Sequence, residues 1–482
     1  MNPLSRKNLI TLLSAFPAST LFAWAVWRMN LHLVSSTFGR TYELFDLFGF
    51  FLSLALLYIA AVEWRARADK RDLTGYLPTL LFLLTAFALL SLRTAYPSLS
   101  IDYRCFARGA QNLALGLNPY FGTKFEYPPL FAQCLVGSHA LLIWAATLLH
   151  LDTSPEGGWR ILYFIYYAAH FGAMLCAYLM THRLGQRIGF REPVLSLLCA
   201  GLFLFSVPMM QNLQFNQTNI FILDILLVIL LLPPSRNLAS GLLAALGTAF
   251  KLYPILVLVP WIRMRRFRAI AAMAMGGAAL LCLETRGFRD WHIISQYLSF
   301  FFHDYPKYIH YRNNCYYSLF ANVLSIIKFH VIPMGRSAFL VFSGTLPMAA
   351  TLLTLVWFGV RGLKRERSFE SALHYGSERD AAQAERERRW LLDMLPLMLL
   401  VSPTLWAHHF ILIIPFVMQA LFDAKQKSPM RIGLFTGLIF LPPVFDIFPF
   451  SYHRLAGLIG LCLSAPMTLT FSEPAKASVP RD

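Results

Sequence analysis

The sequence predicts an all-α, polytopic transmembrane helical protein, on composition and on the length of its apolar blocks. Of the 482 residues, 57% are hydrophobic and 14% are charged, whereas a soluble domain carries about 25% charged residues. The apolar residues come in long blocks, among them 76–92, 194–210 and 220–232. A membrane-crossing helix needs roughly 20 mostly apolar residues. Blocks of this length therefore predict several membrane-spanning helices.

The placement of the basic residues argues for a membrane topology and against nucleic-acid binding, although the net charge is +17. Basic clusters separate the apolar blocks, at Arg65–Arg71, Arg183–Arg191, Arg263–Arg268 and Arg361–Arg389. Lys and Arg are enriched in cytoplasmic loops, so each cluster is expected on the cytoplasmic side. The resulting topology has about 12 to 14 crossings, counting half-helices, and two cytoplasmic termini. This rule does not explain the Lys and Arg residues that the topology places on the outer side.

Since each basic cluster is expected on the cytoplasmic side, the number of membrane crossings between consecutive clusters must be even. This rule divides the chain into four parts. The predicted parts are an N-terminal hairpin at 1–75 with spans near 8–28 and 43–63, a module at 76–283, an outer segment at 284–336, and C-terminal spans at 337–482. The basic N-terminus precedes an apolar run without a cleavage site, so we interpret that run as the first span. The span near 76–95 then leads to an outer loop, 96–129, which is too long for a simple turn.

The remaining spans are expected near 159–181, 193–211, 217–233, 269–284, 337–361, 432–449 and 455–471. Three apolar segments do not fit simple crossings. Parity makes 130–150 a juxtamembrane or re-entrant helix on the outer face, and it makes 238–262 and 390–423 pairs of half-helices. The first pair is predicted to meet at Lys251 and the second at 402–409, because broken helices occur in membranes where they line a cavity or the protein interior. The charged segment 361–389 is predicted to be a solvated helical linker.

Several polar residues converge on the outer face in this topology: Asp102, Asn216, Gln217, Asn219, Lys251, His408 and His409. Polar groups at membrane depth are costly and usually line a functional cavity. Each also has a structural interpretation. Asp102 could cap a helix, the amides could satisfy a hairpin turn, Lys251 could snorkel, and the two histidines could be packing residues. The histidine pair lacks metal-site spacing, and the seven scattered cysteines are expected to be unpaired packing residues.

Four segments in the same order resemble glycosyltransferase family 87, whose members are GT-C-class enzymes. They are Asp102 with Gly116-Leu117-Asn118-Pro119-Tyr120 and Tyr127-Pro128-Pro129; Asn216-Gln217-Thr218-Asn219; Gly241-Leu242-Leu243 with Lys251-Leu252-Tyr253-Pro254; and Ser402-Pro403 with Trp406-Ala407-His408-His409. The similarity covers about residues 76 to 425. It implies a GT-C-type fold with a large first outer loop that carries juxtamembrane helices.

The chain departs from the family pattern in three places. The loop aspartate follows the third predicted span instead of the first, so the N-terminal hairpin is an addition. Asn216 stands where glycine is usual, and Ala407 stands where an acidic residue is often found. The outer segment 284–336 matches none of the family's motifs. The resemblance therefore says least about the acceptor.

The resemblance implies an inverting hexosyltransferase that uses a polyprenyl-phosphate sugar, with mannose as the family default, and a lipid or glycan acceptor on the extracytoplasmic face of a plasma membrane of bacterial type. It makes Asp102 the catalytic base, since a hydroxyl nucleophile needs a carboxylate within hydrogen-bond reach. Lys251, then His408 or His409, and then Arg104 and Arg108 are candidates for the phosphate, whose growing charge needs preset donors.

Asn216, Gln217 and Asn219 are expected to bind the sugar or position their loop, and Tyr127 to set the backbone direction with the two prolines that follow it. No metal or other cofactor is expected, because a monophosphate donor has no diphosphate to hold. The partners are then the donor, the acceptor and membrane lipids. A transporter or lipid-linked-sugar flippase is the alternative, because carriers also have broken helices with polar midpoints. The absence of an internal repeat and the position of the polar groups at one face favour the enzyme. A non-catalytic assembly subunit is a third interpretation.

Overall fold

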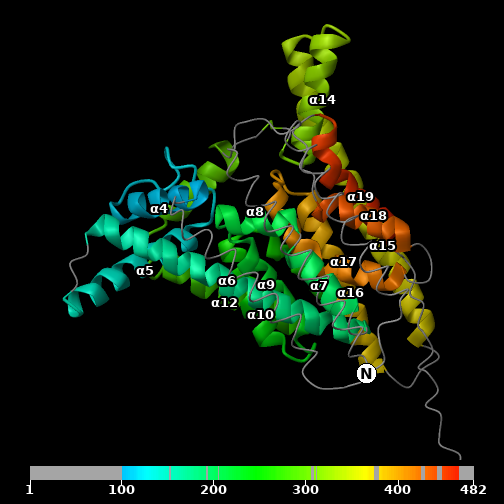
Figure 1. The fold of residues 1–482 in the computed structure, drawn as a ribbon, viewed down its shortest axis with the longest axis horizontal. Coiled ribbons are helices and arrows are strands. Elements are labelled where there is room, and N and C mark those ends of the chain that lie inside the picture. The colour runs from blue at the N-terminus through cyan, green and yellow to red at the C-terminus, as the bar shows by residue number, and fades with distance from the viewer. Residues whose placement is uncertain are drawn as a thin grey trace, which may run out of the picture.

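A computed structural model describes residues 100–150, 154–190, 194–204, 206–304, 309–310, 312–373, 379–424, 429–441 and 448–465. Throughout these ranges the regular structure is helical and contains no strand (Figure 1). The predicted N-terminal hairpin, the span near 76–95 and the start of the outer loop lie outside the described residues.

Among the described residues, four helices are long and apolar enough to cross a membrane: α5 (Pro129–Leu148), α6 (Pro155–Ile188), α12 (Phe267–Glu284) and the part Arg336–Arg367 of α15 (Arg336–Leu373). At 1.5 Å per residue, 20 residues already match a bilayer core of about 30 Å. The all-α membrane architecture is thus confirmed. The predicted spans 159–181, 269–284 and 337–361 lie within or nearly coincide with α6, α12 and α15. The number of crossings and their orientation stay predictions.

The helix α5 begins directly after tandem prolines. Pro128 takes an extended conformation (φ −55°, ψ 155°) and Pro129 is the first helical residue, one residue before the predicted start. Proline suits this position because the first helical N–H has no partner within the helix. α5 packs along α4 (Ile101–Ala114) and α6. α5 is long and apolar enough to cross a bilayer, and its placement at the outer face stays a prediction.

Both predicted interruptions are confirmed as breaks in the helices. α10 (Asn237–Phe250) ends at Lys251, whose φ of −152° and ψ of 138° are extended, and the chain re-enters helix through η2 (Tyr253–Val257) and α11 (Leu258–Arg263). α16 (Arg379–Leu400) is separated by 401–406 from η4 (Ala407–Ile413) and α17 (Ile414–Asp423). Pro254 lacks the N–H that a continuing helix would need.

The predicted hairpin after α6 consists of three helices. The span expected at 193–211 is divided into α7 (Val194–Leu204) and α8 (Val207–Phe215), and α9 (Asn219–Leu231) follows. Ser206 N-caps α8, since its hydroxyl accepts from the Met209 N–H at 3.2 Å. A serine followed by a proline two residues later is a helix-start signal. Prediction of one span from the apolar length of 193–211 missed this signal.

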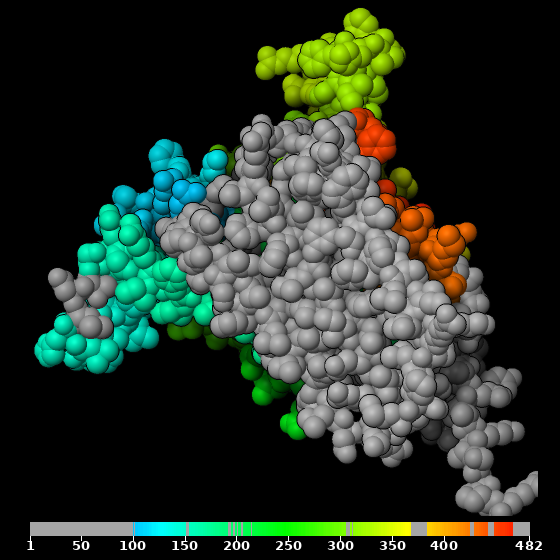
Figure 2. All heavy atoms as spheres, in the orientation of Figure 1, coloured from blue at the N-terminus to red at the C-terminus, as the bar shows by residue number. Residues whose placement is uncertain are grey.

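The outer segment 284–336 contains α13 (His292–Ser299), the π-helical turn η3 (Phe300–Asp304) and α14 (Tyr316–His330). The sequence 288–302, which contains α13, is amphipathic, whereas α14 was not predicted from the sequence. α14 packs against the start of α15, and this pair projects from the rest of the described chain in Figures 1 and 2. The predicted spans 432–449 and 455–471 overlap two 12-residue helices, α18 (Pro429–Phe440) and α19 (His453–Ser464), and η6 (Phe450–Tyr452) precedes α19. Both helices are shorter than a membrane span, so these two crossings stay predictions.

Two hydrophobic clusters hold these helices together. The larger one is built from α6, α9, α10, α16, α17 and the C-terminal pair α18 and α19. The smaller one is mostly aromatic and joins α4 and the loop after it to α5, α6 and α13. Tyr120, for example, stacks on Phe300 with ring centroids 5.0 Å apart. The smaller cluster thereby packs α4 and the loop after it against α13 and η3, which belong to the predicted outer segment.

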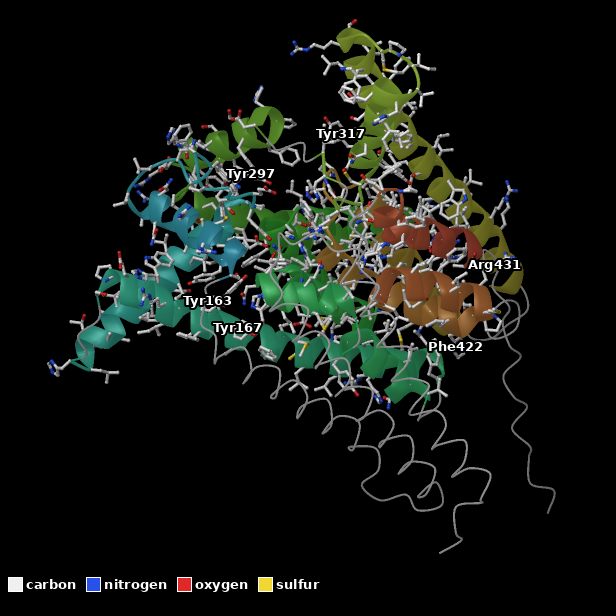
Figure 3. The ribbon with its side chains drawn as sticks, turned by 45° about the horizontal axis from the view of Figure 1, so that its top comes forward. Tyr163, Tyr167, Tyr297, Tyr317, Phe422 and Arg431 are labelled. Atoms are coloured by element: carbon white, nitrogen blue, oxygen red, sulfur yellow. The ribbon has the colours of Figure 1, made fainter. Side chains whose placement is uncertain are left out.

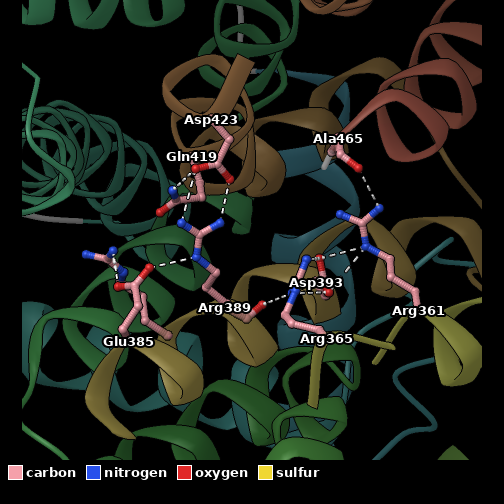
Figure 4. A network of polar contacts seen from close by, with 9 residues as sticks. Arg361, Arg365, Glu385, Arg389, Asp393, Gln419, Asp423 and Ala465 are labelled. Carbon is pink, nitrogen blue, oxygen red and sulfur yellow. Dashed lines mark hydrogen bonds and ion pairs between the residues drawn. The ribbon is translucent and has the colours of Figure 1, made fainter. Parts of the chain in front are cut away.

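The charged segment 361–389 is not a solvated linker at its N-terminal end, which corrects the prediction for that end. Arg361 and Arg365 are buried and share the carboxylate of Asp393 on α16 (Figure 4). Arg361 also donates to the carbonyls of Cys462 (2.9 Å) and Ala465 (3.1 Å). A run of charged residues is usually a solvated face, but here the guanidinium groups of Arg361 and Arg365 connect α15 to α16 and to the end of α19.

Candidate functional site

A cavity of about 560 Å³ lies where the broken helices meet the outer loop. It is lined by Asp102, Tyr127, Gln217, Lys251, His408 and His409, which come from five separate parts of the chain. A concave site in which several polar groups converge is the usual form of a binding site. The structure thus brings together six of the ten site residues predicted from the sequence.

Asp102 lies in the first turn of α4 and does not cap it. Ser100 is the N-cap: its hydroxyl accepts from the Tyr103 N–H at 3.1 Å and donates to the Phe215 carbonyl at 3.3 Å. These two bonds attach the start of α4 to the end of α8. The capping interpretation of Asp102 is therefore wrong, and its half-buried carboxylate faces the cavity instead.

Both polar atoms of the Gln217 side chain form hydrogen bonds with other residues of the cavity. The Tyr127 hydroxyl donates to its Oε1 at 2.7 Å, and its Nε2 donates to Oδ2 of Asp102. Since a phenol next to an amide oxygen and a carboxylate next to an amide nitrogen are the matching pairs, the chemistry fixes the orientation of the amide. Gln217 therefore orients Asp102, and Tyr127 has a role beyond the backbone direction that was predicted for it.

Burial raises the pKa of Asp102 above its ordinary value of 3.8, while the hydrogen bond from Gln217 and the positive charge of Lys251 lower it. Burial is the largest of the three effects. It disfavours the ionised carboxylate because less water solvates the charge. A carboxyl with a raised pKa is a stronger base once it is ionised, which suits proton abstraction from a hydroxyl.

Asn216 and Asn219 both lie outside the cavity wall, in different roles. Asn216 ends α8 in the left-handed conformation, with φ 53° and ψ 45°. Glycine is favoured there and asparagine is the side chain that replaces it most readily, which explains why asparagine can stand at the family's glycine position. Asn219 accepts a hydrogen bond from the Lys251 ammonium at 2.6 Å, and its amide nitrogen lies 3.4 Å from the His408 carbonyl oxygen.

Lys251 is held at the break between α10 and η2 with 8% of its surface exposed. Its ammonium lies 5.0 Å from the ring centroid of Tyr127 and 5.4 Å from that of Tyr253. A lysine that snorkelled to the interface would extend its ammonium into water. The enclosed ammonium, bound to Asn219 and beside two aromatic rings, instead presents a cation to the cavity.

The two histidines are buried in the cavity wall with ring centroids 4.5 Å apart. Nδ1 of His409 accepts a hydrogen bond from the Trp406 N–H at 2.9 Å. An accepting nitrogen carries no proton, so the His409 ring proton is on Nε2. His409 is thereby prepared to donate a hydrogen bond.

Arg104 and Arg108 lie on the exposed side of α4 and do not line the cavity. The cavity contains other charged groups that sequence reasoning missed: Lys124, Glu126, Arg312 and Arg454. The first two lie three residues and one residue before Tyr127, so their proximity to the Tyr127-Pro128-Pro129 motif was an available signal. Arg312 and Arg454 carry no local signal, because only tertiary packing brings their segments to the site.

Among the described residues, no group of three or more His, Cys, Asp or Glu side chains is arranged to hold a metal ion. A family model described as Glycosyltransferase family 87 matches residues 121–377, more than half of the chain. Tyr127, Gln217 and Lys251 lie within the match, whereas Asp102 and the two histidines lie outside it. No curated protein matches the chain.

Proposed function

Since the chain belongs to glycosyltransferase family 87, we propose that it transfers a hexose, with mannose as the first candidate, from a polyprenyl-phosphate sugar to a lipid or glycan acceptor. Transfer takes place on the extracytoplasmic face and inverts the anomeric configuration. The observation that carries the proposal is the pairing of Asp102 with Gln217 in a cavity that also contains Lys251 and the two histidines.

In the proposed step, an acceptor hydroxyl oxygen bonds to the anomeric carbon while the bond from that carbon to the phosphate oxygen breaks. The hydroxyl proton moves to Asp102, and the bonding electrons leave with the lipid phosphate. Because Gln217 binds Oδ2 of Asp102, the other carboxylate oxygen is the one that we assign to the acceptor. Attack from the side opposite the phosphate inverts the configuration.

We assign the leaving phosphate to Lys251, His408 and His409. Lys251 supplies a positive charge and His409 an N–H, and all three line the same cavity with little exposure. Preset donors stabilise developing charge most strongly where water is excluded. The positions of Arg104 and Arg108 outside the cavity give them no contact in this arrangement.

We assign the acceptor to the wall contributed by the outer segment. Tyr297, Phe301 and Arg312 line the cavity from there, and Figure 3 shows Tyr297 beside α4, the helix that carries Asp102. Aromatic rings offer an apolar platform for a sugar ring, and a guanidinium offers hydrogen bonds to its oxygens. Under this assignment the outer segment 284–336, which the family resemblance does not explain, binds the acceptor.

The experiment that tests the function is transfer in proteoliposomes from radiolabelled polyprenyl-phosphate mannose, with host lipid extract as acceptor. Parallel reactions contain the corresponding glucose and arabinose donors. We expect a labelled, extractable product with one of these donors. No product with any of them, together with passage of the labelled lipid across the bilayer, would support the flippase instead.

Replacing Gln217 by leucine is expected to move the acidic limb of the pH–rate profile to higher pH. Asp102 must be ionised to act as the base, so activity is lost as pH falls through its pKa. The Gln217 hydrogen bond lowers that pKa, and its removal therefore raises it. The measurement is initial transfer rate against pH. Gln211→Leu, on the same cavity wall, is the control and should keep the wild-type midpoint; an unshifted midpoint for Gln217→Leu contradicts the pairing.

Replacing Lys251 by methionine is expected to lower kcat by about 10²-fold, the usual loss when a preset charge-stabilising donor is removed. Methionine keeps much of the side-chain volume and removes the charge. The matched control is Lys124→Met, because Lys124 also lines the cavity but is exposed. Transfer kinetics at saturating acceptor provide the readout. Equal losses in the two variants would contradict the assignment of the phosphate to Lys251.

A further inference from the structure

A second cavity, of about 720 Å³, lies where α10 and α12 begin. It shares no lining residue with the catalytic cavity, and the proposed transfer does not use it. Three arginines, Arg265, Arg266 and Arg268, line it together with the carboxylate of Glu387. Sites for small ligands have volumes of about 300–1,000 Å³, so this cavity is large enough to hold one.

The two cavities lie at opposite ends of the same helices. α10 begins at the second cavity with Asn237 and ends beside Lys251 in the catalytic cavity, 14 residues or about 21 Å along the helix axis. α12, a candidate membrane span, packs along α10 (Figure 1) and begins at the second cavity with Phe267. At its other end, the Glu284 carbonyl accepts a hydrogen bond from Gln133 of α5 at 2.9 Å. Since α5 starts at the catalytic cavity, the second cavity lies at the far end of a span.

The polar contacts of the Arg266 side chain are all made within the cavity wall. Its Nε donates to Oδ1 of Asn237 at 2.9 Å, and its Nη2 donates to the Pro234 carbonyl at 2.8 Å. Its Nη1 pairs with Glu387. This pair neutralises the one acidic side chain that lines the cavity among the described residues. Arg266 and Glu387 therefore hold the wall together and add no net charge to it.

The other two arginines keep a net positive charge at the cavity. Arg265 and Arg268 are exposed, and neither side chain forms a hydrogen bond or ion pair with another described residue. Arg265 also stands in the left-handed conformation, with φ 54°, at the turn between α11 and α12. Glycine is the residue favoured at such a helix end. Two cations thus remain at the cavity with no carboxylate to balance them.

The starts of α10 and α12 favour an anion as well. Neither helix has a side-chain cap, and the first N–H groups of a helix lack partners within it and carry partial positive charge. The two helices approach closely near these ends, because a Cβ on Gly241 would lie 2.4 Å from the Ala269 carbonyl oxygen. Both helix starts therefore add to the charge of the two arginines at one cavity.

Exposed apolar side chains next to the arginines indicate that the anion belongs to a lipid. Phe267 lines the cavity and is 64% exposed, and Leu238 and Ile262 beside it in sequence are 60% and 58% exposed. At the end of a membrane span, such side chains suit acyl chains while the arginines reach the headgroup depth. Basic pockets between membrane helices bind phosphate headgroups of lipids.

We propose that the second cavity binds the phosphate headgroup of an anionic phospholipid through Arg265 and Arg268, in the leaflet opposite the catalytic cavity. A guanidinium group can bind two phosphate oxygens at once. The acyl chains lie along the exposed apolar side chains at the starts of α10 and α12. The basic cluster at 263–268 is predicted to face the cytoplasm, so this is the cytoplasmic leaflet. The site does not depend on the proposed function.

The test measures lipid binding to the purified full chain in detergent, without a sugar donor. Radiolabelled phosphatidylglycerol, which is anionic, is titrated in parallel with phosphatidylcholine, which is zwitterionic. We expect saturable binding of phosphatidylglycerol only. In the double variant Arg265→Asn, Arg268→Gln the affinity is expected to fall about 25-fold, about fivefold for each arginine. Asparagine is chosen at 265 because it tolerates the left-handed conformation.

The matched control is Arg263→Gln. Arg263 is exposed and belongs to the same basic cluster, but it does not line the cavity, so this variant should bind close to the wild-type affinity. Equal losses in the control and the double variant would assign the binding to general surface charge and overturn the site. Should the double variant not fold, Arg268→Gln alone decides by its expected fivefold loss.

Two further results would overturn the lipid assignment. One is binding of phosphatidylcholine as tight as that of phosphatidylglycerol. The other is binding of inorganic phosphate that requires the two arginines, with no binding of phosphatidylglycerol, which would assign the cavity to a soluble anion. Because binding is measured without transfer, a chain that is inactive with every sugar donor contradicts the proposed function and leaves this result unchanged.

Discussion

Replacing Asp102 by asparagine is expected to reduce kcat for sugar transfer by about 10²- to 10⁴-fold, the range for loss of a general base. Asparagine is nearly isosteric and has no basic oxygen to take the acceptor proton. The start of α4 is capped by Ser100, so the helix has no need of the carboxylate. The measurement is initial rate at saturating donor, with donor KM determined in parallel.

The control for this variant is Asp304→Asn, which removes an exposed carboxylate from η3 in the outer segment. It should transfer at the wild-type rate. Equal activity of Asp102→Asn and wild type would exclude Asp102 as the base. Weaker donor binding with kcat preserved would move Asp102 from proton transfer to substrate binding.

Replacing Asp393 by asparagine is expected to destabilise the protein by about 3–5 kcal/mol, the usual result of breaking a buried ion pair from one side. Asp393 is 3% exposed and faces two guanidinium groups (Figure 4). Arg361 contacts it at 3.4 Å, and Arg365 binds both of its oxygens. The neutral variant leaves two buried cations without this carboxylate. The midpoint of denaturation in detergent is the measurement.

Glu385→Gln is the matched control for this loss. Glu385 binds Arg388 and Arg389 on its own helix, and its side chain is 24% exposed. Partly exposed i,i+4 pairs contribute about 0.3–0.5 kcal/mol, so this variant should denature close to wild type. A similar decrease in both variants would show that the Asp393 cluster is no more important to the fold than a surface pair.

The ion-pair cluster also shows where sequence reasoning about charge reaches its limit. Arg361 and Glu385 belong to the same charged run, yet one is buried and the other is partly exposed. The run predicts a solvated segment because charged side chains are rarely buried without partners. The partners of Arg361 are Asp393 on α16 and two carbonyls at the end of α19, and no local pattern connects these positions.

The sequence alone determined the all-α membrane class, the helix breaks at Lys251 and at 402–409, and six of the cavity residues. Apolar length, prolines and ionisable residues within apolar blocks are local features with large energetic consequences in a bilayer, so they can be recognised without a structure. The residue type at position 216 likewise agrees with the left-handed turn found there. The order of the four motifs indicated the family before any geometry was known.

Only the tertiary structure decided what these residues contact. Gln217 binds Asp102 across 115 positions of sequence. Arg312 and Arg454 reach the cavity from segments without a recognisable motif, while Arg104 and Arg108, beside Asp102 in sequence, point away from it. The physical reason is that a hydrogen bond or ion pair depends on distance in space, and helix packing sets that distance independently of separation along the chain.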